Sequence, residues 1–300
     1  MSQPIAGLAH LHQVMAALPG PDEAAEARWA DHEPRLTKPG GALGRLEEIG
    51  RWLCTWQGRH PPRLDKPVCR IFAGNHGVAA RGVSAFPAEV TVQMVANFQT
   101  GGAAINQLCR TFGIELQVMA LELDRPTRDF TIEPAMSEAE MLAAFNAGMA
   151  SVPADADLLC VGEMGIGNTT AAAALGFALF GGSVEDWVGR GTGVDDERLA
   201  VKTRVVAEGI ALHRAQDPAE ILRRLGGREL AAMAGAVLGA RLKRVPVLLD
   251  GYVCTAAAAT LHAINRRALD HCLVAHASAE PGHHRMVGRL GRKPLFDLGM

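Results

Sequence analysis

The sequence has little net charge, no long hydrophobic run and no basic leader segment. Its formal net charge is −2 over 300 residues, so the charge balance gives no sign of a nucleic-acid partner or an anionic membrane. No apolar run reaches the length of a membrane span, about 20 residues. Residues 1–20 include His and Gln but no basic start, so we expect no signal peptide. Together these absences predict a cytoplasmic protein.

The cysteines and histidines show none of the spacings that are typical of metal or redox sites. The six cysteines lie far apart without a Cys-x-x-Cys pair, and several fall in apolar runs, where a reduced thiol packs as a small hydrophobe. The eleven histidines include the adjacent pair His283 and His284 but no His-Glu-x-x-His. We therefore expect no bound metal.

Short apolar runs alternate with longer helical patterns after Pro61 and Pro62. Most of these runs are continuous and not two-periodic, which is typical of strands buried on both faces of a parallel sheet. Five strands are predicted, at residues 68–73, 116–121, 157–161, 245–249 and 272–275. Helices are predicted between them, at residues 88–109, 137–150, 170–180, 199–214, 218–225, 229–242 and 256–268.

This alternation predicts an α/β fold, a doubly wound and mainly parallel sheet with helices on both faces and right-handed crossovers. Hydrophobic residues make up 48% of the 300 residues, which is ample core for one large domain or for one large and one small domain. Residues 8–58 have an amphipathic helical pattern. We expect a helical segment over 1–62 and an α/β domain over 63–280.

The segment 162–172, Gly-Glu-Met-Gly-Ile-Gly-Asn-Thr-Thr-Ala-Ala, is the most informative part of the chain. It follows a predicted strand and opens a predicted helix, whose first-turn N–H groups can bind an anion. Glycines let the backbone approach a ligand, and Asn168, Thr169 and Thr170 can cap the helix or donate to phosphate oxygens. An ordinary capped turn explains the segment equally well.

This segment differs from two common nucleotide-binding motifs. A Walker A loop requires Gly-Lys-Ser/Thr, which is missing, and a dinucleotide fingerprint requires a third glycine. Glu163 is also unusual, because a phosphate repels a neighbouring carboxylate. It fits the segment if it faces ribose hydroxyls or a cationic ring.

Polar or glycine-rich tips follow all five predicted strands. In open α/β sheets, ligands bind outside the carboxyl ends of the strands. A solvated loop explains each tip taken singly, but the five together predict a cleft at this edge of the sheet. The tips contain Asn75 and His76, Glu122 and Asp124, Glu163 with residues 165–168, Asp250 and Gly251, and His276 with Ser278 and Glu280.

Two further segments could line this cleft. Residues 189–196 form a glycine-dense loop whose acidic end can cap the next helix, and Lys202 on that helix could reach a phosphate, although a lone Lys usually lies on a solvated face. Phe86, Gln93 and Met94 make a plausible slot for a flat heteroaromatic ring. Core packing explains these three residues equally well.

Seven ordered motifs resemble those of the nicotinate-nucleotide–dimethylbenzimidazole phosphoribosyltransferase family, which belongs to cobalamin lower-ligand synthesis. The resemblance runs from about residue 36 to residue 300, in order and with compatible spacing. Any one motif is weak, whereas seven in order are highly specific. They are LTKPGGALGRLE at 36–47, GNHGV at 74–78, GVSAFP at 82–87, EMGIGNTT at 163–170, GRGTG at 189–193, VLLDG at 247–251 and SAEPGH at 278–283.

The resemblance implies transfer of 5-phosphoribose from nicotinate mononucleotide to 5,6-dimethylbenzimidazole, which gives α-ribazole 5′-phosphate and nicotinate. It implies no metal or redox cofactor, because the pyridinium of the substrate is already a cationic leaving group. It also implies a Rossmann-like large domain, a small helical domain in which residues 281–300 complete residues 1–62, and a homodimer.

Site residues follow from the resemblance, position by position. Glu163 is implied near the ribose and the reacting centre. Phe86, Gln93 and Met94 are implied to line the benzimidazole slot. The implied phosphoribosyl site consists of Gly165, Gly167, Asn168 and Thr169, with Lys202 and Ser278 as phosphate ligands.

One departure from the family pattern concerns the general base. Family members continue past residues 297–300 with an Arg-Leu-Gly-Glu-Gly segment, whose glutamate is the expected base for the benzimidazole proton. The present sequence ends at Met300, so this glutamate is expected beyond Met300 and is absent from the 300 residues. We therefore expect turnover to be lowered by about 10²–10⁴-fold.

Two other functions remain open. One is a non-catalytic protein of the same fold that binds the nucleotide or the benzimidazole, which product beyond one equivalent per chain would exclude. The other is a Rossmann-like oxidoreductase, which the incomplete Gly-x-Gly-x-x-Gly pattern disfavours.

Overall fold

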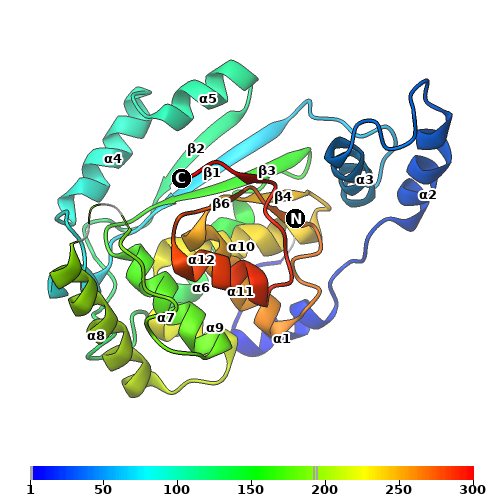
Figure 1. The fold of residues 1–300 in the computed structure, drawn as a ribbon. Helices are drawn as coiled ribbons and strands as arrows, with labels where there is room; N and C mark the ends of the chain where they lie inside the picture. The colour runs from blue at the N-terminus through cyan, green and yellow to red at the C-terminus, as the bar shows by residue number, and fades with distance from the viewer. Residues whose placement is uncertain (1–2, 192, 194) are drawn as a thin grey trace.

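A five-stranded parallel sheet forms the centre of the computed structural model, which describes residues 3–191, 193 and 195–300. The strands lie in the order β2-β1-β3-β4-β5, and each neighbouring pair is parallel (Figure 1). All five predicted strands are confirmed. They are β1 (Pro67–Ala73), β2 (Glu115–Ala120), β3 (Leu158–Met164), β4 (Val247–Leu249) and β5 (Cys272–Val274).

The strand order places a topological switch point between β1 and β3. From β1 the chain passes to β2 at one edge, and it then returns to β3 on the other side of β1. At such a point a crevice opens outside the carboxyl ends of the two strands. β1 and β3 pair in register from Pro67 with Leu158 to Ala73 with Met164, so both strands end at the same level.

Helices cover both faces of the sheet, as predicted for a doubly wound fold. One face packs against α10 (Arg228–Leu242) and α11 (Tyr252–Ile264). Outside these lie α6 (Glu138–Ala150), α7 (Asn168–Phe180) and α9 (Pro218–Leu225), which complete the main hydrophobic core. The other face carries α4 (Glu89–Thr100) and α5 (Ala104–Phe112), which lie on the β2 side of the sheet (Figure 1).

The helix predicted over residues 88–109 is two helices, α4 and α5, so its continuity is a wrong prediction. Gly101 ends α4 with a φ of 83°, a left-handed conformation that favours glycine. Gly102 then lies against the side chain of Asn97, where a Cβ would collide with its oxygen. The two glycines therefore turn the chain although the apolar pattern continues through them.

The remaining elements surround this core. They are α8 (Asp196–His213), α12 (Pro281–Arg289), the short 3-10 helices η1 (Glu33–Arg35) and η2 (Gly77–Arg81), and a parallel strand pair of β6 (His276–Ala277) with β7 (Phe296–Asp297). Asp195 caps α8 as predicted, since its Oδ1 accepts from the Arg198 N–H at 2.8 Å. Among the described residues, no helix combines the length and apolarity that crossing a membrane requires.

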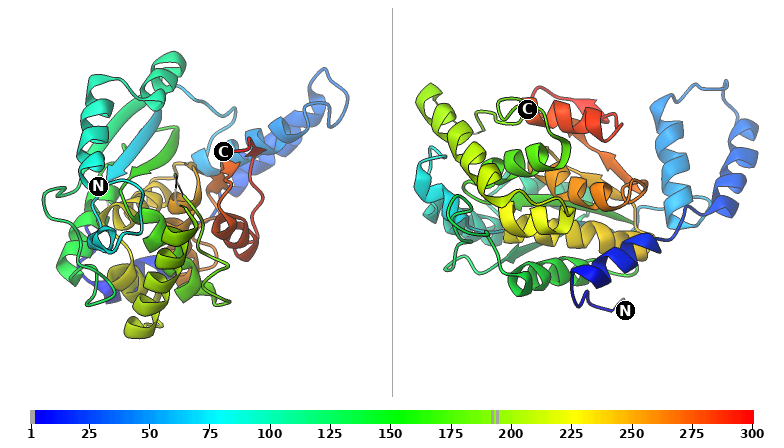
Figure 2. Two further views of the ribbon diagram at one scale, coloured as in Figure 1. Left: turned by 60° about the vertical axis from the view of Figure 1, so that its left-hand side comes forward. Right: turned by 90° about the horizontal axis from the view of Figure 1, so that it is seen from below.

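The N-terminal helices divide between two environments. Helix α1 (Leu8–Ala16) buries Leu11 and Met15 in the main core. In contrast, α2 (Glu23–His32) and α3 (Arg45–Gln57) form a hairpin that projects from the body in every view (Figures 1 and 2). The division into domains at 1–62, 63–280 and 281–300 stays a prediction.

Candidate active site

The glycine-rich segment lies at the switch point, between β3 and α7. The strand expected to end at residue 161 continues to Met164, because Glu163 and Met164 pair with Phe72 and Ala73 of β1. Glu163 is therefore held in the sheet itself and not in the loop. The Gly74 N–H donates to the Met164 carbonyl at 3.0 Å, which ties the segments after the two strands together.

Helix α7 begins at Asn168, two residues earlier than predicted, and its N-terminus opens into a cavity of about 230 Å³. Gly167 caps the helix with a φ of 94°, a conformation that a side chain would strain. Residues 163–169 line the cavity together with Val83, Ser84, Phe86, Arg190 and Gly191. The site therefore presents a helix N-terminus, which favours negatively charged ligands.

Glu163 contributes a carboxyl group to this cavity. Asn168 Nδ2 donates to its Oε2 across the first turn of α7. Burial and, to a smaller extent, the negative charges of Glu229 and Asp250 raise the pKa of Glu163 to about 8, although the Asn168 hydrogen bond opposes this shift. The group is thus mostly uncharged at neutral pH in the empty site.

Lys202 reaches the same region from α8, and it is not a solvated lysine. Only 1% of it is exposed, and its Nζ donates to Thr169 Oγ1 at 2.9 Å and to the Gly189 carbonyl at 2.8 Å. Burial lowers the pKa of Lys202 to about 8, and the charge of Glu280 opposes that shift. A buried amine at a helix N-terminus is suited to bind an anion.

Ser278 is connected to this cluster by hydrogen bonds of Glu280. Its Oγ accepts from the Glu280 N–H at 3.3 Å, and the Glu280 carboxylate accepts from the Gly191 N–H at 2.6 Å. Glu280 therefore links the segment after β6 to the glycine-dense loop before α8. Thr192 and Val194 of that loop lie outside the described residues.

Met300, after which the general-base glutamate is expected, does not itself belong to the candidate site. It is exposed and does not line the cavity at the N-terminus of α7. Its carbonyl accepts from the Ala279 N–H at 2.5 Å, next in sequence to both Ser278 and Glu280. The position of the base after Met300 stays a prediction, since it concerns a glutamate outside the 300 residues.

The three residues predicted for a base slot are only partly brought together. Phe86 lines the cavity with Glu163 and is about half exposed. Gln93 and Met94 lie on α4 and do not belong to the lining of that cavity. Their role in base binding stays a prediction.

Thr91 of α4 had no predicted role, yet it contacts the glycine-rich loop directly. It is fully buried, and its Oγ1 accepts from the Ile166 N–H at 3.1 Å. This bond fixes the middle of the loop against α4. A threonine in a helical pattern carries no sequence signal for such a contact, because its partner lies 75 residues away.

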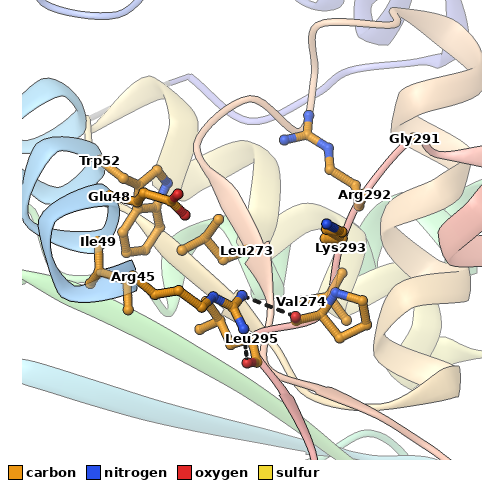
Figure 3. Close-up of a pocket in the computed structure, with 11 residues that line it drawn as sticks. Arg45, Glu48, Ile49, Trp52, Leu273, Val274, Gly291, Arg292, Lys293 and Leu295 are labelled. Carbon is orange, nitrogen blue, oxygen red and sulfur yellow. Dashed lines mark hydrogen bonds between the residues drawn. The ribbon is translucent and has the colours of Figure 1, made fainter. Parts of the chain in front are cut away.

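A larger cavity of about 590 Å³ lies elsewhere, between α3 and residues 291–295 (Figure 3). Arg45 spans it and donates to the carbonyls of Pro294 and Leu295 (Figure 3). None of the candidate residues lines this cavity, so volume alone does not identify the active site. In the part of the chain that the structure describes, no three His, Cys, Asp or Glu side chains are grouped to hold a metal ion.

Fold and site together define a class, the doubly wound α/β proteins with a glycine-rich loop and a helix N-terminus at the switch point of the sheet. A family model described as "Phosphoribosyltransferase" matches residues 18–300. The nicotinate-nucleotide–dimethylbenzimidazole phosphoribosyltransferase of Ruegeria pomeroyi is 59% identical over 293 residues, which cover 98% of this chain and 87% of that protein. The enzyme of the same name from Cereibacter sphaeroides is 57% identical, and the match covers 100% of this chain and 89% of that protein.

Solved structures agree with these relatives. The crystal structure of the nicotinate-nucleotide–dimethylbenzimidazole phosphoribosyltransferase of Thermus thermophilus superposes with a TM-score of 0.85 at 38% identity. The match covers 93% of this chain and 89% of that one. The chain belongs to the nicotinate-nucleotide–dimethylbenzimidazole phosphoribosyltransferase family, and it is a phosphoribosyltransferase.

Proposed function

We propose that the protein transfers 5-phosphoribose from nicotinate mononucleotide to 5,6-dimethylbenzimidazole in cobalamin synthesis. In a single displacement, a benzimidazole nitrogen attacks the anomeric carbon while the bond from that carbon to the nicotinate nitrogen breaks. The electron pair of the broken bond neutralises the pyridinium nitrogen, and the benzimidazole loses its N–H proton. The products are α-ribazole 5′-phosphate and nicotinate, with inversion at the anomeric carbon.

Each part of the site has a role in this proposal. The backbone at Gly165 and Gly167, the N-terminus of α7 at Asn168 and Thr169, and the Lys202 amine hold the phosphate, with Ser278 at the edge. The Glu163 carboxyl group faces the ribose. As the nicotinate leaves, positive charge develops on the ribosyl carbon, and an ionised Glu163 stabilises it. Phe86, Gln93 and Met94 are the proposed contacts of the incoming base.

The observation that carries the proposal is that an amine and a carboxyl group both lie at the N-terminus of α7. Lys202 and the N-terminus of α7 favour an anion, and the Glu163 carboxyl group lies across the first turn of the same helix. A 5-phosphoribosyl group needs this arrangement, since its phosphate is negative and its anomeric carbon becomes positive during transfer. The relatives from Ruegeria pomeroyi and Cereibacter sphaeroides are named as phosphoribosyltransferases for the same two substrates.

The test is an end-point mass-spectrometric assay with nicotinate mononucleotide and 5,6-dimethylbenzimidazole. We expect more than one equivalent of α-ribazole 5′-phosphate per chain, which excludes a protein that only binds. Glu163→Gln should lower turnover by about 10²-fold or more while the nucleotide still binds. Glu185→Gln, which changes an exposed carboxylate, is the matched control. Nucleotide binding without product from the unaltered chain would instead favour the binding protein.

The expectation about the general base has its own test. Adding an Arg-Leu-Gly-Glu-Gly segment after Met300 should raise turnover by about 10²–10⁴-fold if its glutamate accepts the benzimidazole proton. The same segment with glutamine in place of that glutamate is the control. Equal rates for the two versions would contradict the role of the carboxylate.

We also propose that the protein is a homodimer. Light scattering coupled to size-exclusion chromatography measures the mass of the assembly, and a mass near that of one 31.8 kDa chain would contradict the dimer.

A further inference from the structure

A second carboxylate lies directly behind the glycine-rich segment. Glu229 is the second residue of α10 and is fully buried, with 0% of it exposed. His76, which follows β1, is also buried, and its Nε2 is hydrogen-bonded to Glu229 Oε1. The pair thus connects the first turn of α10 to the segment after β1. Neither residue lines the cavity at the N-terminus of α7.

The backbone around the switch point is shaped to accommodate the Glu229 carboxylate. A Cβ on Gly74 would collide with its Oε2. A Cβ on Gly165 would lie 2.7 Å from the Gly74 carbonyl oxygen and 3.1 Å from Glu229 Oε1, and a Cβ on Gly227 would collide with the His76 ring and lie 2.8 Å from Glu229 Oε2. The carboxylate is therefore wedged between the segments that follow β1 and β3 and the start of α10. Its Oε2 has no hydrogen-bond partner within the described residues.

Asp250, in the segment after β4, is another carboxylate near Glu163. It is mostly exposed, with 64% of its side chain accessible, and His276 Nε2 lies 3.2 Å from its Oδ1. Asp250 and Glu163 line one side of an apolar cavity of about 460 Å³ on the outer face of the sheet. Two carboxylates, Glu229 and Asp250, thus lie near Glu163, and each is paired with a histidine.

Within the described residues, the titratable or charged groups that face Glu163 come from several elements. They are Glu229 on α10 with its partner His76 after β1, Asp250 after β4 with its partner His276 on β6, Cys254 on α11, and Arg190 in the loop before α8. The two carboxylates both act against ionisation of Glu163, and together with burial they raise its pKa to about 8.

We propose that Glu229 and Asp250 are positioning residues that keep Glu163 protonated before substrate binds, so that it ionises when the pyridinium ring of a ribosyl donor lies beside it. Nearby negative charges in a poorly solvated site disfavour a further negative charge. A pyridinium nucleotide supplies the compensating positive charge, and Glu163 then releases its proton to solvent as the carboxylate forms. The negative charge is therefore present only when there is a cation for it to stabilise.

One experiment tests the charge state without any turnover. Infrared absorption of the protonated carboxyl group is followed against pH in the ligand-free protein, and Glu163→Gln identifies the band. We expect this band to titrate near neutral pH or above in the unaltered chain. Glu229→Gln and Asp250→Asn should each move its midpoint down by roughly one pH unit. Asp250 is exposed, so its variant should fold even if the Glu229 variant does not.

A second experiment measures the protons released on binding. Calorimetric titration with nicotinate mononucleotide at pH 7, in buffers of different ionisation enthalpy, should show release of most of one proton per site. Glu229→Gln should release clearly less, because more of its Glu163 is already ionised. Glu185→Gln is the matched control and should behave as the unaltered chain.

The outcomes separate this inference from the proposed function on which its calorimetric part rests. Absence of nucleotide binding by the unaltered chain would count against the proposed function. Binding without proton release, or a Glu163 band that a folded Glu229→Gln variant leaves unmoved, would overturn the inference. If Glu229 had a purely structural role, Glu229→Gln would lower the stability of the protein but leave the titration of Glu163 unchanged.

Discussion

Two side chains at the site, Glu163 and Lys202, are shifted toward their uncharged forms. Burial moves the pKa of Glu163 up to about 8 and the pKa of Lys202 down to about 8. Both groups are therefore close to their midpoints in the empty site at slightly alkaline pH. A ligand that carries both signs of charge can restore the charge of both groups, and this links binding to pH.

Replacement of Glu163 should change stability in a pH-dependent way. The folded protein keeps the Glu163 proton up to a pKa of about 8, whereas the ordinary value is 4.5, so the unaltered chain loses stability as pH rises between these values. Gln does not titrate. The change in the free energy of unfolding that Glu163→Gln causes should therefore be more favourable at pH 9 than at pH 5. The expected difference is about 2 kcal/mol, a value discounted for partial exposure of the Glu163 side chain. Urea unfolding at the two pH values measures this difference, and a constant difference would contradict the raised pKa.

Replacement of Lys202 should weaken binding of the nucleotide. Lys202→Met removes a charge-assisted contact to phosphate, which corresponds to an affinity loss of about 10- to 100-fold. Because only the protonated amine contributes, binding by the unaltered chain should weaken as pH rises above about 8, whereas Lys202→Met should lack that part of the pH dependence. Calorimetry with nicotinate mononucleotide measures both effects. Lys66→Met, which changes an exposed lysine, is the control.

Helix α4 acts on the site through one hydrogen bond to the loop between β3 and α7. Thr91→Val keeps the shape of the side chain but leaves the buried Ile166 N–H without an acceptor, at a cost of about 1–3 kcal/mol. We also expect a lower kcat, since the loop carries the phosphate site. Thermal unfolding and the product assay measure the two effects. Thr260→Val is a matched control, because that buried hydroxyl donates to the Ala257 carbonyl of its own helix. An equal loss of activity in both variants would argue against a specific role for α4.

The strands and most helices were predictable because their apolar patterns are local. The end of β3 was missed, since Gly162, Glu163 and Met164 lack an apolar pattern and are held in the strand by pairing with β1. The division of residues 88–109 was missed for the opposite reason, because the apolar pattern runs through Gly101 and Gly102. Elements defined by pairing or by backbone conformation were thus harder to predict than those defined by hydrophobicity.

The same distinction applies to the site. The glycine-rich segment and Lys202 could be identified from motif and position, although the burial of Lys202 could not. The contacts of Thr91 and Glu229 join residues 75 and 153 positions apart in sequence. No local pattern records such pairs. Only the strand order, which brings β1, β3 and the start of α10 to one edge, makes them neighbours.

At the scale of the molecule, the α2–α3 hairpin is attached to the body by Arg45 at the start of α3 and by Arg241, which packs near the end of α3. Arg241 of α10 lies over the Trp56 ring at 4.1 Å from its centroid and donates to the Pro19 carbonyl at 2.8 Å. Arg241→Leu removes both contacts, which we expect to cost about 1–3 kcal/mol. Hydrogen exchange should become faster in α2 and α3 while the amides of β1 and β3 stay protected. Arg266→Leu, at an exposed position, is the control, and uniform acceleration across the sheet would contradict a local attachment.

The crowding around Glu229 also has a genetic consequence. Every amino acid that replaces a glycine adds at least a Cβ, and at Gly74, Gly165 and Gly227 this atom would lie less than 3 Å from Glu229 or from a group beside it. In a saturation library, these three positions should therefore be nearly as intolerant as positions that contact substrate. Shortening Glu229 should partly rescue folding of an alanine at Gly74, because it vacates the space that the new methyl group requires. The Glu229 carboxylate thereby restricts which residues are tolerated in the segments packed against it.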